Sequence, residues 1–137
     1  MVRAFLEGLM GQWGVNLLDF YAANSLWINL LVLVYGAWVV SSWVNLKSIR
    51  RLLIGALEEQ MQGRPEFAKG DVPPKALASL IIPWERAVAD ARFPFVAQQT
   101  DLLPHRKTID TVRRMLPGDQ ITQDALDNFR LRSKKTA

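Results

Sequence analysis

The chain contains no cysteine and a single histidine, and these two shortages exclude several classes of site. Without cysteine there is no disulfide framework, no thiolate-bound zinc, no iron–sulfur cluster and no covalently attached c-type haem. Other metal sites need several ligands at defined spacing, and His105 has no second histidine to join it. We therefore expect no metal and no cofactor, and we interpret His105 as a loop residue that is exposed or contacts a partner.

The sequence also lacks the patterns of common catalytic and nucleotide-binding sites. It has no G-x-S-x-G, no phosphate-binding loop and no dinucleotide glycine pattern. Its one pair of adjacent carboxylates, Glu58 and Glu59, would point about 100° apart on a helix and could not share a proton. The basic residues are dispersed among acids without interleaved aromatics, although the net charge is +4. We expect neither enzymatic activity nor a nucleic-acid partner.

Charged residues are missing between Phe20 and Leu46, and this gap is the most informative absence. Within it, residues 26–44 are apolar nearly throughout and would form a helix about 28 Å long, close to the thickness of a bilayer's hydrocarbon core. Trp27 and Trp43 lie near its ends, where amphipathic rings favour the headgroup boundary. The pattern predicts one transmembrane helix over residues 25–45, with these two tryptophans as interface anchors. It fits a cleaved signal peptide poorly, because the apolar run begins well inside the chain.

The distribution of Lys and Arg on the two sides of this segment predicts its orientation. Residues 1–24 contain only Arg3, whereas residues 46–65 contain four basic residues: Lys47, Arg50, Arg51 and Arg64. By the positive-inside rule, we expect a single-pass protein of a bacterial inner membrane with its N-terminus outside and its C-terminus in the cytoplasm. Lys47, Arg50 and Arg51 would lie at headgroup level, so they are candidates for contact with anionic lipid.

The segments on either side of the span show helical periodicity of apolar residues. In residues 1–24 the spacing predicts an amphipathic segment in the outer interface, with a stripe of Leu6, Met10, Trp13, Leu17 and Phe20. After the span, a second stripe predicts a cytoplasmic amphipathic helix over residues 46–62, formed by Leu46, Ile49, Leu53, Leu57 and Met61. The Gly63-Arg64-Pro65 sequence is typical of a helix stop.

Residues 63–137 are predicted to form an extra-membrane arm of short pieces, because six of the seven prolines fall within residues 63–104. We expect short helices at 75–82 and 84–92, extended chain at 93–96 and no sheet. A helix over 107–116 and another from an N-cap at Thr122 to Leu131 would follow, with a basic tail after them. Such short segments are expected to become buried against a partner. The predicted fold class is mainly α: a single transmembrane helix continuing into a cytoplasmic helix, then an irregular, proline-punctuated arm with short helices.

Small and polar residues within the span are candidates for helix packing: Asn29, Gly36, Ala37 and Ser41. An amide in hydrocarbon usually faces another helix, and Ala37 and Ser41 have small-xxx-small spacing; the alternative is that Asn29 is wetted at the outer interface. The sequence favours a non-catalytic accessory subunit of a larger membrane complex, with other integral membrane subunits and the bilayer as partners. Respiratory and photosynthetic electron-transport complexes are the candidates, since they contain small redox-silent subunits. A stand-alone, membrane-anchored adaptor or regulator that recruits a cytoplasmic partner remains the alternative.

Overall fold

A computed structural model describes residues 1–136, and for Leu6 the backbone alone. The structure is mainly helical, as predicted, and divides into two compact units, Met1–Trp38 and Val39–Ala137. Its elements are the long helix α1 (Val2–Met61), the 3-10 turn η1 (Pro65–Phe67), α2 (Pro74–Ala78), α3 (Trp84–Asp90), the strands β1 (Phe95–Val96) and β2 (His105–Arg106), α4 (Ile109–Met115) and α5 (Gly118–Thr136).

The first unit is the N-terminal part of α1, and Gly11 interrupts its helical backbone with φ 65° and ψ −162°. Glycine adopts a positive φ at little cost, so it permits a turn here that a residue with a Cβ would oppose. The turn brings the Arg3 guanidinium within 3.2 Å of the Asp19 carboxylate. In an unbroken helix, 16 residues would separate the two by about 24 Å. The predicted segment 1–24 is therefore helical, but it bends back on itself at Gly11.

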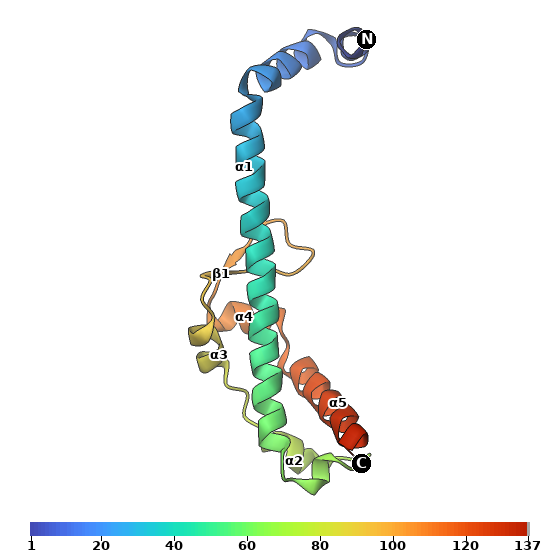
Figure 1. Cartoon of the computed structure of the whole chain (residues 1–137), viewed down its shortest axis with the longest axis vertical. Coiled ribbons are helices and arrows are strands. Elements are labelled where there is room, and N and C mark those ends of the chain that lie inside the picture. The colour runs from blue at the N-terminus through green and yellow to red at the C-terminus, as the bar shows by residue number, and fades with distance from the viewer. Residues whose placement is uncertain (137) are drawn as a thin grey trace. The chain divides into compact units, whose positions relative to one another are not determined.

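The second unit is built on the last part of α1, whose predicted apolar stripe is buried. Leu46, Ile49, Leu53, Leu57 and Met61 are at most 6% exposed. The residues that pack with them come from every later helix and from β1: Phe67, Ala76, Trp84, Ala87, Val96, Val112, Ile121 and Leu126. The arm thus becomes buried against the chain's own helix (Figure 1), where the sequence led us to expect a partner.

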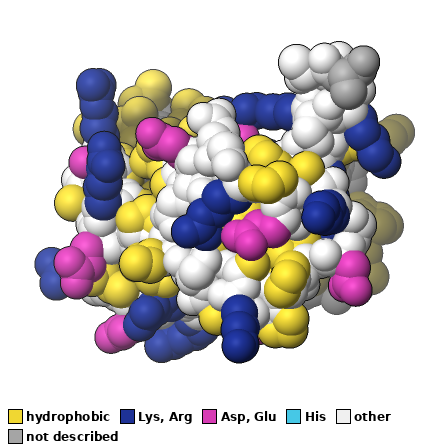
Figure 2. Space-filling view, turned by 90° about the horizontal axis from the view of Figure 1, so that it is seen from below, with side chains coloured by type: hydrophobic (Ala, Val, Ile, Leu, Met, Phe, Trp, Pro, Cys, Tyr) yellow, Lys and Arg dark blue, Asp and Glu magenta, His cyan; other side chains and the backbone are white. Residues whose placement is uncertain are grey.

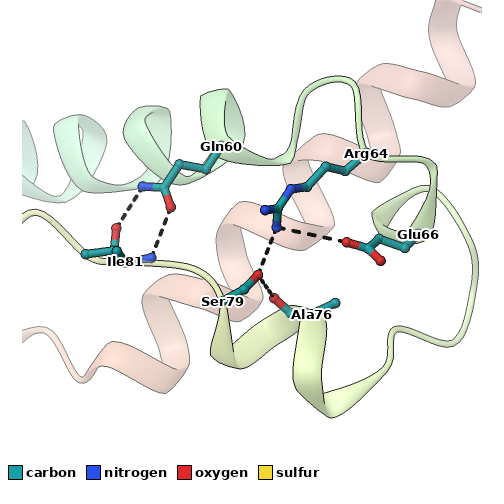
Figure 3. Close-up of polar contacts among 6 residues, drawn as sticks. All are labelled: Gln60, Arg64, Glu66, Ala76, Ser79 and Ile81. Atoms are coloured by element: carbon teal, nitrogen blue, oxygen red, sulfur yellow. Dashed lines mark hydrogen bonds and ion pairs between the residues drawn. The ribbon is translucent and has the colours of Figure 1, made fainter.

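The end of α1 is where the sequence predicted it. Gly63 has a φ of 78°, the left-handed conformation that commonly follows a helix, and Pro65 then opens η1. The segment between α2 and α3 is tied back to the last turn of α1 (Figure 3). There the Gln60 side-chain amide donates to the Ile81 carbonyl at 2.8 Å and accepts from the Ile81 N–H at 3.0 Å. Arg64 donates to the Ser79 hydroxyl at 2.8 Å.

Helix α5 lies alongside the second half of α1 and runs in the same direction (Figure 1). Two ion pairs join the helices, Arg50 with Asp124 and Glu58 with Arg132, the second at 2.9 Å. Between these pairs both helices advance by eight residues, so the pairs lie about 12 Å apart along either axis. The equal spacing shows that α5 and α1 keep the same register between the two pairs.

The start of α5 differs from the prediction. Thr122 is not its N-cap, because the helix begins at Gly118 and the Thr122 hydroxyl donates to the Gly118 carbonyl at 2.8 Å within it. The earlier start places Ile121, 1% exposed, on the buried face together with Ala125. Pro117 precedes the first turn of α5. A backbone N–H at this position would have no partner within the helix, so proline loses no hydrogen bond there. The helix also continues to Thr136, through most of the predicted basic tail.

The remaining predicted segments are present with shifted ends. Helix α2 is shorter than the predicted 75–82, and α3 and α4 fall inside the predicted 84–92 and 107–116. Thr108 caps α4 by accepting from the N–H of Thr111 at 3.2 Å. Of the predicted extended segment 93–96, only Phe95–Val96 forms a strand. The expectation of no sheet was wrong, because Phe95 lies opposite Arg106 and Val96 opposite His105 in an antiparallel pair. We refer to residues 93–107 as the hairpin.

Candidate membrane and helix-contact surfaces

The apolar part of α1 exposes nearly all of its large side chains. Leu26, Leu31 and Leu33 are each about 70% exposed, and Val32, Val34 and Val40 more than half. Of the residues that the structure describes, a single helix, Glu7–Met61, is long and apolar enough to cross a membrane. Most of this apolar surface is exposed among the residues that the structure describes, so it is available to lipid or to other helices.

The four helix-packing candidates differ in their surroundings. The carbonyl oxygen of the Asn29 amide accepts a hydrogen bond from the Tyr21 hydroxyl at 3.1 Å, so one of its polar atoms is satisfied within the chain. Ala37 and Ser41 are exposed, whereas Gly36 is half-buried. Because Tyr21 satisfies part of the amide, Asn29 depends less on a second helix than the sequence alone suggested.

The two predicted anchors present different surfaces. Trp27 is 65% exposed on the first unit. Trp43 is half-buried in the second unit, and the Lys47 ammonium lies 3.9 Å from its ring centroid in a cation–π contact. A tryptophan beside a lysine is an arrangement suited to the boundary between apolar and polar surroundings.

The three basic candidates for lipid contact are not equivalent. They line one groove together with Asp124, Asp127 and Asn128 of α5. Arg50 is engaged by Asp124 and Lys47 lies over Trp43, while Arg51 is exposed. The carboxylates of α5 therefore compensate part of the positive charge that the sequence places after the span.

Sequence reasoning missed a polar contact that joins α1 to the hairpin. The side-chain amide of Asn45 donates to the carbonyls of Phe93 at 2.8 Å and Phe95 at 2.9 Å. One turn earlier, the carbonyl of Ser42 accepts from the N–H of Ala97 at 3.3 Å. Ser42 is fully buried and Asn45 is 7% exposed. Ser42 and Asn45 are polar residues three positions apart at the end of an apolar run. This pattern could have indicated that another segment packs against α1 there.

These bonds also give the direction of the hairpin along α1. As the chain runs from Phe93 to Ala97, its partners on α1 step back from Asn45 to Ser42. Residues 98–104 follow Ala97 directly, so the loop begins at the level of Ser42. This loop carries Leu102, 80% exposed, and Leu103, 64% exposed. Figure 1 shows it beside α1 above β1.

One face of the second unit carries charges of both signs. The face seen in Figure 2 intersperses Lys and Arg with Asp and Glu, so charge of one sign does not gather there. Within residues 1–136, no three His, Asp or Glu side chains come together in a group that could hold a metal ion. His105 is exposed and lies in β2, whereas we predicted a loop.

Comparison with known proteins gives no relative for this arrangement: the chain matches no protein-family model, no curated protein and no solved structure.

Proposed function

We propose that the protein is a single-pass, non-catalytic subunit of a larger bacterial membrane assembly, anchored by α1 and carrying its second unit in the cytoplasm. The observation that carries this proposal is the apolar surface of α1, where most of the large side chains between residues 26 and 40 are exposed. An exposed apolar patch beyond a few hundred Å² is typical of a membrane or protein interaction site. Lipid and the helices of other subunits are the surroundings that suit it.

The hairpin suggests where the membrane-spanning part of α1 ends. The hairpin packs against Ser42 and Asn45. Its backbone is partly irregular, and irregular backbone would lose its hydrogen bonds in hydrocarbon, so we place the hydrocarbon boundary just before Ser42. On the other side, the last charge is Asp19. The uncharged residues 20–41 are numerous enough to cross a bilayer, which needs about 20 residues. The proposed span thus begins five residues and ends four residues before the predicted 25–45.

The proposed orientation can be tested with single cysteines, because the chain has none of its own. Gln12→Cys and Asn128→Cys place a thiol at an exposed position on either side of the span. In intact cells, a membrane-impermeant maleimide should label the first and should label the second only after lysis. Labelling of Asn128→Cys but not Gln12→Cys in intact cells would reverse the orientation, and labelling of both would argue against a span.

The proposed role is tested by purification of the tagged full-length chain in mild detergent. A constitutive subunit should retain its partners in fixed stoichiometry through ion exchange. Loss of all partners at high salt would instead favour the stand-alone adaptor, since a transient cytoplasmic contact depends more on charge. Ala37→Leu enlarges an exposed small residue and should lower the yield of partners if that surface packs against another helix. Leu33→Ile, at an exposed position, is the matched control.

A further inference from the structure

We propose that the hairpin loop, residues 98–104, is a second membrane contact that inserts Leu102 and Leu103 into the interfacial layer of the bilayer. The inference rests on the proposed function, because it takes α1 as the span. It adds that this loop holds the second unit against the surface of the bilayer, on the side of the membrane where the second unit lies.

The position of the hairpin carries the argument. Hydrogen bonds from Asn45 and to Ser42 place residues 93–97 beside the end of the proposed span, with Ala97 at the level of Ser42. The loop begins at that level, so its two leucines lie close to the boundary where the hydrocarbon is proposed to begin. Both side chains are more than 60% exposed, so the fold does not use them for its own core.

The residues at the base of the hairpin fit the same placement. Arg106 is exposed and lies opposite Phe95, which is bound by Asn45, so it lies at the level of α1 where Trp43 and Lys47 occur. Basic and tryptophan side chains at this level match the headgroup layer of an interface, in which the acyl chains lie further inside. Irregular backbone cannot enter the hydrocarbon without losing its hydrogen bonds, so the tip would stop in the interfacial layer.

The test uses the full-length chain reconstituted into vesicles of phosphatidylethanolamine and phosphatidylglycerol. An environment-sensitive fluorophore is attached to one cysteine at a time: Leu103→Cys in the loop, Leu33→Cys in the proposed span and Lys135→Cys at the far end of α5. Nitroxide-labelled lipid then quenches fluorophores that lie in the bilayer. We expect Leu33→Cys and Leu103→Cys to be quenched roughly two-fold or more beyond Lys135→Cys, with deeper nitroxides favouring Leu33→Cys because interfacial insertion is only about 5–10 Å deep.

The outcomes separate the two proposals. If Leu33→Cys is quenched and Leu103→Cys behaves like Lys135→Cys, the loop does not touch the membrane and this inference is overturned, while the span stands. If Leu33→Cys itself escapes quenching, the proposed span fails. A double variant, Leu102→Ser with Leu103→Ser, provides a second measurement: addition of vesicles should slow amide exchange of residues 98–104 in the wild type and not in this variant. Equal slowing in both would also overturn the inference.

Discussion

Replacing Asn45 with alanine should release the hairpin from α1 while leaving the rest of the second unit folded. The side chain donates to two backbone carbonyls, of Phe93 and Phe95, at 2.8 and 2.9 Å, and it is 7% exposed. Each such hydrogen bond contributes about 1 kcal/mol net, and a buried carbonyl left without its donor costs more. The loss is therefore about 2 kcal/mol or above for local opening of the hairpin, with no large cavity in the main core.

Amide hydrogen exchange of the purified full-length chain measures this opening directly. A change of 2 kcal/mol corresponds to about a 30-fold difference in an equilibrium constant, since 1.4 kcal/mol is ten-fold. Peptides that contain the amides of Ala97 and Lys107 should exchange faster by about that factor, because opening of a local unit controls their protection. Peptides from Leu53–Met61 of α1 should keep the exchange of the wild type.

Ser48→Ala is the matched control, because Ser48 lines the same groove as Asn45 but is exposed. It should leave the exchange of the hairpin unchanged. If Asn45→Ala also leaves residues 93–107 unchanged, the two hydrogen bonds do not hold the hairpin and the reasoning is refuted. If it accelerates exchange in all of the second unit equally, the hairpin is not a separate opening unit.

Three further predictions concern the second unit and are read by denaturant unfolding in mild detergent. Leu53→Ala should destabilise the unit by about 2–5 kcal/mol, because the Leu53 side chain is fully buried. The control Leu52→Ala should destabilise it by less than about 1 kcal/mol, because the neighbouring Leu52 side chain is half-exposed. Equal effects would contradict the packing. Gly63→Ala should destabilise by about 1 kcal/mol because its φ is 78°, while Gly55→Ala, in open space within α1, should stabilise by about 0.5–1 kcal/mol; the same sign for both would argue against that helix end. A shortened chain of residues 64–137 should show no sharp unfolding transition, because it lacks the buried stripe of α1; a cooperative transition would show that the arm folds without it.

The long helix and its buried stripe could be predicted because their signals are local and periodic. Leu46, Ile49 and Leu53 repeat at the spacing of one helix face, and Gly63 with Pro65 ends the pattern. The sequence could not predict which segments of the chain cover the stripe, because that depends on contacts between residues far apart in the sequence. The two ion pairs to α5, for example, join residues 74 positions apart.

The errors at α5 and at the hairpin have a common cause. Thr122 has the residue type of an N-cap, but burial of Ile121 favours a helix that starts one turn earlier, so tertiary packing overrides the local preference. The strands β1 and β2 are two residues each, too short to give an alternating pattern. Their pairing is supported from outside by Asn45, which the sequence analysis had assigned to the span.

The packing of the arm also changes what the proposed role requires of it. An arm whose apolar residues were exposed would need to lie over a neighbouring subunit, but here Phe67, Val96 and Ile121 are already buried against α1. The second unit therefore has a core of its own, built on the last part of α1. Partners would then meet two kinds of surface: the apolar residues of α1 within the bilayer, and the mixed charges of the second unit outside it. Since exposed ion pairs contribute little and are screened by salt, we expect the helix surface to supply most of the affinity and the charged surface of the second unit to supply orientation.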